Sequence, residues 1–70
     1  MKYRDVAKRL RELGCEELAG GKGSHRKWHN PANGKVAVIP DWGPKDLAPG
    51  TVRAAIRELG VSREDFGPVK

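Results

Sequence analysis

The stretch HRKWHNPANGKVAVIP, residues 25–40, decides the fold, because it reads as two strands joined by a short connection. Residues 25–30 alternate polar side chains around a tryptophan, and residues 35–39 form a run rich in β-branched side chains. The connection ends in Asn33-Gly34, a dipeptide typical of tight hairpin turns. The stretch therefore predicts an antiparallel β-hairpin that ends at Pro40.

Two amphipathic helices are predicted, one before and one after this hairpin. Residues 3–13 and residues 49–59 place apolar side chains at helical spacing, and a glycine directly follows each segment. The apolar positions expected to face one side of the sheet are Tyr3, Val6, Leu10, Val52, Ile56 and Leu59.

The remaining segments complete the pattern. Residues 15–19 suit a short first strand at the edge of the sheet, and residues 20–23 read as a flexible glycine turn. Near the C-terminus, Ser62 with Asp65 three residues later predicts a capped helical turn, after which Phe66 docks on the core.

The predicted order is therefore α-β-β-β-α, within one domain that spans residues 1–70. A three-stranded antiparallel sheet is stable only when one face is covered, and the two helices are the elements that can cover it. This α+β layout, with both helices on one face of the sheet, is that of the double-stranded RNA-binding fold. A fold alone does not determine a function.

The charge is unevenly distributed along the chain. The 70 residues carry a formal net charge of +5, and residues 21–45 hold five cationic side chains against one acidic side chain. The basic charge of this middle segment is typical of a protein that binds a polyanion. It is equally typical of a solvated surface that keeps a small protein in solution. A chain this short cannot enclose a deep pocket, which favours a polymer laid across one face.

Cysteine content and hydropathy indicate which covalent links, metal sites and cellular location to expect. The single cysteine, Cys15, excludes an intrachain disulfide and leaves too few thiols for a structural zinc site. No apolar run approaches 18 residues, and the N-terminus lacks signal-peptide features, so a soluble cytoplasmic protein is expected. Since Cys15 follows a glycine that ends a helix, we expect a small core-facing residue rather than a nucleophile.

The segment Lys22-Gly23-Ser24-His25 carries the residue types that chemistry on a phosphate needs. Cleaving RNA without metal requires a proton taken from the 2′-hydroxyl, a proton given to the leaving oxygen and positive charge near the phosphorus. An imidazole suits the proton transfers, because its ordinary pKa of about 6.5 lies near neutral pH. The opposing interpretation is a surface histidine at the start of a strand.

The second histidine, His29, lies four residues further on and on the same face of the strand as His25. At roughly 3.3 Å per residue the two are about 13 Å apart, too far to act on one scissile bond or to share one metal ion. We therefore expect His29 to lie on the surface of the hairpin or to contact an RNA backbone. We expect no metal or other cofactor.

The two tryptophans are predicted to lie in different environments. A sheet this small needs a large residue against its helices, which favours a core position for Trp28. Trp42 lies in a Gly/Pro-rich loop, and its side chain could either stack on an unpaired base or pack against the protein. The second helix begins after Lys45, so its amide end could hold a phosphate, although an ordinary helix start explains it as well.

Over nearly its full length the chain resembles the HicA-type (YcfA-like) toxins. The matching pieces, in order, are Leu13-Gly14, Gly23-Ser24-His25, Trp28 with Pro31 and Gly34, Pro40, Lys45-Asp46-Leu47, Gly50-Thr51-Val52-Arg53, Leu59-Gly60 and Glu64-Asp65-Phe66. The resemblance implies a double-stranded RNA-binding-like fold and metal-independent cleavage of mRNA. It also implies His25 as the active residue and a HicB-like antitoxin as the partner, which we expect to cover His25.

The residues expected to contact RNA, taken from the motif, from charge and from stacking, are Lys22, Gly23, Ser24, Arg26, Lys27, Trp42 and Lys45. The alternative function is a non-catalytic RNA-binding module that uses the same basic face. A helix-turn-helix DNA binder fits poorly, because strands separate the two helices.

Overall fold

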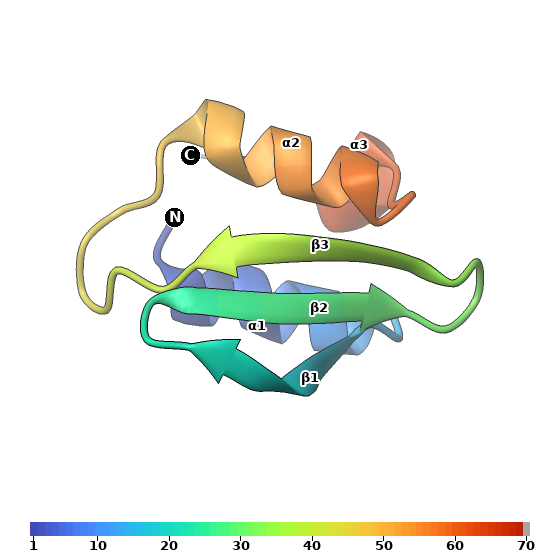
Figure 1. Cartoon of the computed structure of the whole chain (residues 1–70). Helices are drawn as coiled ribbons and strands as arrows, with labels where there is room; N and C mark the ends of the chain where they lie inside the picture. The colour runs from blue at the N-terminus through green and yellow to red at the C-terminus, as the bar shows by residue number, and fades with distance from the viewer. Residues whose placement is uncertain (70) are drawn as a thin grey trace.

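A computed structural model describes residues 1–69; Lys70, the last residue of the predicted domain, lies outside the described residues. The elements in chain order are α1 (Tyr3–Glu12), β1 (Glu16–Lys22), β2 (His25–Asn30), β3 (Lys35–Pro40), α2 (Pro49–Glu58) and α3 (Arg63–Phe66). The strands form one antiparallel sheet in the order β1-β2-β3 (Figure 1). The predicted α-β-β-β-α arrangement and α+β class are confirmed.

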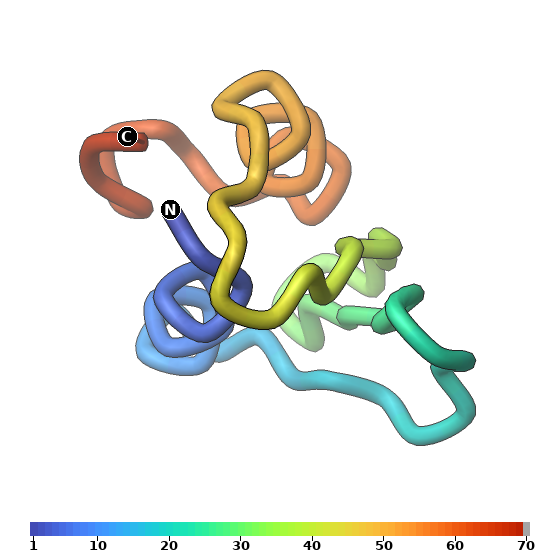
Figure 2. The backbone as a smooth tube through the Cα atoms, turned by 90° about the vertical axis from the view of Figure 1, so that its left-hand side faces the viewer, coloured from blue at the N-terminus to red at the C-terminus, as the bar shows by residue number. Residues whose placement is uncertain are grey.

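Both long helices lie on the same side of the sheet (Figures 1 and 2). Alternation along the strands turns Trp28 of β2 and Ala37 and Ile39 of β3 towards them, and these side chains are buried. The six helix positions predicted to face the sheet are all buried in the same core cluster. The other face of the sheet carries no covering element among residues 1–69, and we call it the open face.

The β2–β3 hairpin is fastened to the end of α2. Gly34 N–H donates to the Asn30 carbonyl at 2.8 Å, which closes the turn. The side-chain amides of Asn30 and Asn33 both donate to the Leu59 carbonyl, at 2.8 and 3.0 Å. A carbonyl at a helix end has no intrahelical partner, so these two bonds satisfy it and fix α2 against the hairpin.

A polar contact ties α1 to the sheet inside the core. Trp28 Nε1 donates to the Tyr3 hydroxyl at 3.0 Å, and that hydroxyl donates to Glu17 Oε1 at 2.8 Å. Burial, followed by the hydrogen bond to Glu17, raises the pKa of Tyr3 to about 12. The core-facing position predicted for Trp28 is confirmed.

The first strand differs from the prediction. The strand was expected over residues 15–19 and the turn over residues 20–23, but β1 runs to Lys22 and the turn is Gly23-Ser24 alone. The prediction was wrong because adjacent glycines usually mark a turn, whereas here they lie within an irregular part of the ladder. Cys15 precedes the strand and is buried, as predicted, and burial raises the pKa of its thiol.

The C-terminal segment matches its prediction. Ser62 Oγ accepts from Asp65 N–H at 3.0 Å at the start of α3, and Phe66 is buried in the core. The Arg9 guanidinium donates to the Phe66 and Pro68 carbonyls at 3.3 and 2.6 Å, which holds this segment against α1. No helix among residues 1–69 is both long and apolar enough to cross a membrane.

Candidate active site

His25 is the first residue of β2, and its side chain lies on the open face of the sheet. Its strand partners are Lys22 on β1 and Pro40 on β3. The side chain is exposed and makes no hydrogen bond or ion pair with any other residue in the described range 1–69. The imidazole is therefore free to meet a ligand from solvent.

Lys22 lies directly across from His25, since a turn of only two residues, Gly23-Ser24, joins them. Side chains of directly opposed residues leave the sheet on the same side, with Cβ atoms about 4.5–5.5 Å apart. The lysine ammonium can therefore reach the space above the imidazole. The structure places the segment singled out from the sequence, Lys22 to His25, at one end of the sheet.

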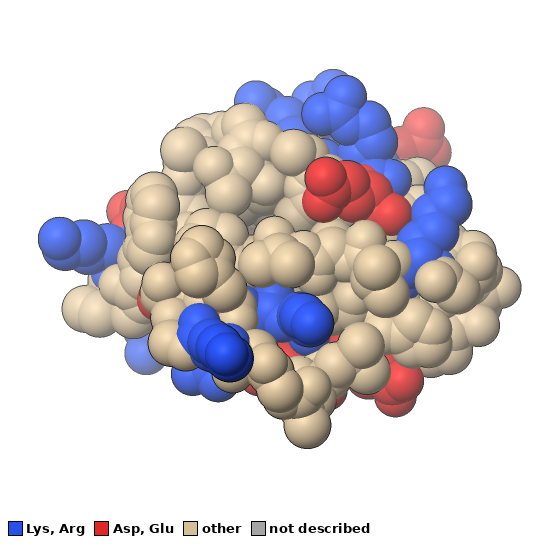
Figure 3. All heavy atoms as spheres, viewed as in Figure 1, with Lys and Arg blue, Asp and Glu red and all other residues tan. Residues whose placement is uncertain are grey.

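The open face continues along β2 away from this turn. Lys27 shares the face of His25, and its neighbours across the sheet are Leu18 and Val38. Figure 3 looks onto this face and shows basic side chains, in blue, over β1 and β2, surrounded mainly by uncharged residues. A basic surface thus extends from the turn towards the middle of the sheet.

His29 lies at the far end of the same face, between Glu16 on β1 and Val36 on β3. Its Nδ1 is 3.0 Å from Glu16 Oε1. The two histidines are separated along the strand, as predicted, because His25 is the first residue of β2 and His29 is the last but one. His29 is thus engaged by a carboxylate and does not meet His25.

Arg26 is not part of this surface. Alternation turns it to the covered face, where its guanidinium lies 3.8 Å from Glu17 and 3.7 Å from Asp41. Adjacent residues of a strand cannot share a face, so Arg26 and His25 point in opposite directions. Arg26, which was predicted to bind RNA, therefore lies on the opposite face of the sheet from His25.

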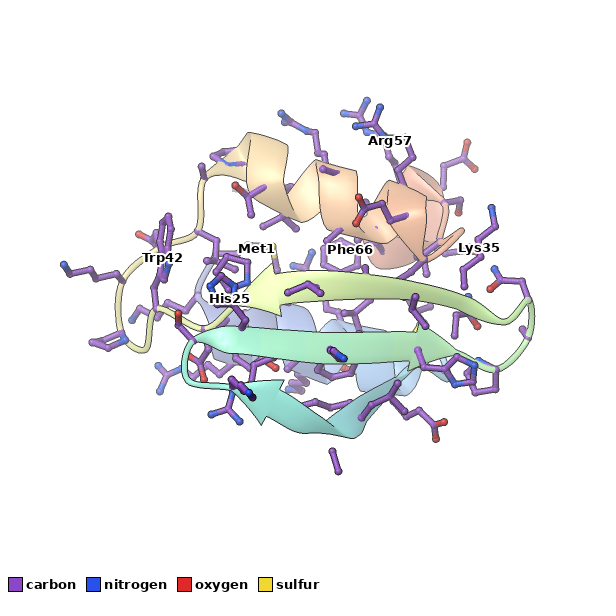
Figure 4. The ribbon with its side chains drawn as sticks, in the orientation of Figure 1. Met1, His25, Lys35, Trp42, Arg57 and Phe66 are labelled. Carbon is purple, nitrogen blue, oxygen red and sulfur yellow. The ribbon has the colours of Figure 1, made fainter. Side chains whose placement is uncertain are left out.

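The loop after β3 returns to the His25 end of the sheet. Asp41 N–H donates to the Ser24 carbonyl at 2.6 Å, which joins the loop to the β1–β2 turn. Figure 4 shows Trp42 and His25 at the same end of the molecule, with Lys35 at the other. Trp42 is 47% exposed and lines a shallow hollow with Lys45.

Sequence reasoning missed the role of Asp41. Its carboxylate accepts from Gly43 N–H at 2.9 Å and so holds the loop in the shape that presents Trp42. The signal was present in the sequence, since Asp followed two residues later by Gly is typical of an Asx turn. Lys45 lies in this loop, and α2 begins only at Pro49, so Lys45 does not border the helix start.

Within residues 1–69 there is no group of three or more His, Cys, Asp or Glu side chains placed to hold a metal ion. The candidate site therefore consists of one open imidazole, a lysine opposite it, a two-residue turn and an adjacent loop with an exposed indole.

The fold and this surface define a small basic α+β protein with a histidine–lysine pair open to solvent. The family model for the HicA toxin of bacterial toxin–antitoxin systems matches residues 3–61. The chain is 38% identical over 61 residues, 87% of this chain and 97% of the relative, to the "Probable mRNA interferase HicA" of Pseudomonas fluorescens strain Pf0-1. No solved structure matches. The chain belongs to the HicA toxin family.

Proposed function

We propose that this chain is a cytoplasmic toxin that cuts mRNA by metal-independent transesterification, with His25 as its catalytic residue. The class, an RNA-cleaving toxin of a toxin–antitoxin system, follows from the family and from the name of the relative. The proposal adds the catalytic residue, the reaction course and the independence from metal.

In the proposed reaction the RNA 2′-oxygen attacks the adjacent phosphorus while the bond from phosphorus to the 5′-oxygen breaks. One proton leaves the 2′-hydroxyl and another is delivered to the departing 5′-oxygen, so the products are a 2′,3′-cyclic phosphate and a 5′-hydroxyl. The His25 imidazole carries one of these protons. The Lys22 ammonium lies opposite and stabilises the negative charge that builds up on the phosphoryl oxygens.

The observation that carries the proposal is the position of His25. It stands at the end of an uncovered sheet face with a lysine opposite and no protein partner among residues 1–69. An RNA strand laid along this face would meet Lys27 further along β2, the Gly23-Ser24 turn at its end, and Trp42 and Lys45 on the adjacent loop. We leave Arg26 out of the contact surface because it lies on the covered face.

A non-catalytic RNA-binding module could use the same basic face, and one experiment separates the two. Single-stranded RNA is incubated with the protein in excess EDTA, and both the chain length and the termini of the RNA are analysed. We expect shortened RNA that carries 2′,3′-cyclic phosphate and 5′-hydroxyl ends. Intact RNA retained by the protein would favour the binding module, and cleavage that EDTA abolishes would contradict the metal-independent course.

We further propose that the antitoxin partner is HicB-like and covers His25. An exposed site on an RNA-cleaving toxin has to be blocked in its own cell, and the open face offers a broad surface for this. A stable complex would bury roughly 1,200–2,000 Å² in total. The neighbouring gene product should co-purify with the toxin and stop cleavage. A partner that binds while cleavage continues would exclude this arrangement.

A further inference from the structure

Strand β1 pairs irregularly with β2 immediately beside the candidate site. Leu18 lies opposite Lys27 and Lys22 lies opposite His25, so three residues of β1 face a single residue of β2 between these two pairs. The three residues are Ala19, Gly20 and Gly21, which we call the glycine bulge. Bulges bend a strand and change the direction of nearby side chains.

The hairpin itself does not need the glycine bulge. If Gly20 and Gly21 were absent, Ala19 would pair with Arg26, and Lys22 would still lie opposite His25 on the open face. The two-residue turn would be unchanged as well. Register and turn therefore leave the two extra residues unexplained.

The contact between Gly21 and β2 supplies an explanation. A Cβ atom at Gly21 would lie 2.7 Å from the His25 carbonyl oxygen, 3.3 Å from the Arg26 Cα and 3.4 Å from the Lys27 nitrogen. All three are backbone atoms, which cannot rotate away as a side chain can. Gly20, with φ +96°, supplies the bend that brings Gly21 this close.

We propose that the glycine bulge positions His25, with the Gly21 backbone packed on the His25 carbonyl to fix where β2 begins and how the imidazole leaves the sheet. Gly21 is a positioning residue, and the inference rests on the proposed catalytic role of His25. A methyl group at position 21 displaces the His25 backbone, and with it the imidazole. The same methyl group would make only an ordinary contact, at 3.4 Å, with the backbone nitrogen of Lys27, which we propose to hold the RNA, so Lys27 keeps its place on the open face.

The first test compares Gly21→Ala with Gly50→Ala, a control in α2 where an added Cβ meets nothing within 4 Å. We expect Gly21→Ala to lower kcat by up to about 10²-fold, with KM nearly constant, because small misplacements of a catalytic group are costly. In histidine NMR spectra the His25 imidazole signals should move, while those of His29 stay in place. Gly50→Ala should match the wild type in kcat, in KM and in the histidine NMR signals.

An unchanged kcat in Gly21→Ala overturns the inference, and so does a lowered kcat with unmoved His25 signals. If Gly21→Ala does not fold, deletion of Gly20 and Gly21 together answers the same question, since it removes the contact but keeps register and turn. A folded deletion variant with wild-type kcat also overturns it. The proposed function has its own test, because it is contradicted if His25→Ala cleaves RNA at the wild-type rate. In that case the histidine NMR signals of Gly21→Ala alone show whether Gly21 positions the imidazole.

Discussion

The two faces of strand β2 differ in burial and in the contacts of their side chains, although their residues alternate along six positions of sequence. On the covered face, Trp28 is fully buried and hydrogen-bonded, and Asn30 donates to the end of α2. On the open face, His25 and Lys27 are exposed to solvent, and His29 lies 3.0 Å from the exposed carboxylate of Glu16. One face of the strand therefore holds the fold together, while the other is available for chemistry.

Because of this difference, substitutions at neighbouring residues of β2 should have different effects. A change on the covered face should cost stability, because it opens a cavity or leaves a buried polar group unpaired. A change on the open face should cost activity or RNA affinity while the fold persists, because exposed side chains contribute little to stability.

The largest expected effect on stability comes from Trp28→Ala, compared with its neighbour Lys27→Ala. Removing the buried indole should lower the free energy of unfolding by about 3–5 kcal/mol, since the small core cannot fill the cavity. Lys27→Ala should change it by no more than about 0.5 kcal/mol. Urea unfolding followed by circular dichroism measures both. Equal losses would mean that the two faces do not differ as described.

Tyr3→Phe should have the next largest effect. The variant keeps the ring but removes the acceptor for Trp28 Nε1 and the donor to Glu17. A buried N–H without a partner costs about 1–3 kcal/mol, so the midpoint of urea unfolding should fall accordingly. RNA cleavage by the folded variant should stay at the wild-type rate, because Tyr3 lies on the covered side. A stable variant with impaired cleavage would contradict this division.

The double substitution Lys22→Ala with Lys27→Ala should weaken the salt dependence of RNA binding. Each lysine that neutralises a phosphate of a single strand contributes about 0.7 to the slope of log K against log salt concentration. We therefore expect the slope to flatten by about 1–2 units, measured by fluorescence anisotropy with an uncleavable RNA. Lys35→Ala, at the other end of the sheet, is the control. An unchanged slope would place the RNA elsewhere, such as on the basic side of α1.

The last effect is expected only at alkaline pH. The pKa of Tyr3 is raised to about 12 by burial and by the hydrogen bond to Glu17, whereas an unfolded tyrosine titrates near 10. Between these two values the folded state keeps a proton that the unfolded state has lost, so the free energy of unfolding falls as pH rises. Tyr3→Phe should lose less stability than the wild type from pH 10 upwards. Parallel losses in both proteins would assign the alkaline effect to other groups.

Much of the fold could be predicted because the deciding patterns are local. The β-branched run of residues 35–39, the Asn33-Gly34 turn and the apolar spacing in both helices each indicate one structure with little competition. The first strand could not be predicted in the same way. Its two glycines lie within an irregular part of the ladder, where Gly21 closely approaches the backbone of β2, and that contact between strands is absent from the local pattern.

The candidate site shows the same limit. Period-two alternation places His25, Lys27 and His29 on one face of β2 and Arg26 on the opposite face. Arg26 was nevertheless counted among the RNA-binding residues, because that set was drawn from charge as well as from the motif and from stacking. Pairing with Glu17 and Asp41 depends on tertiary contacts between β1, β2 and the loop after β3.

The catalytic role of His25 is tested by comparing His25→Ala with His29→Ala on one RNA in the presence of EDTA, with folding checked by circular dichroism. The two side chains lie on the same strand and the same face, but His25 is exposed opposite Lys22 whereas His29 is paired with Glu16. Loss of one proton-transfer group should slow cleavage by His25→Ala about 10²–10⁴-fold, while His29→Ala stays near the wild-type rate. Wild-type cleavage by His25→Ala, or equal losses in both variants, would contradict the assignment of catalysis to His25.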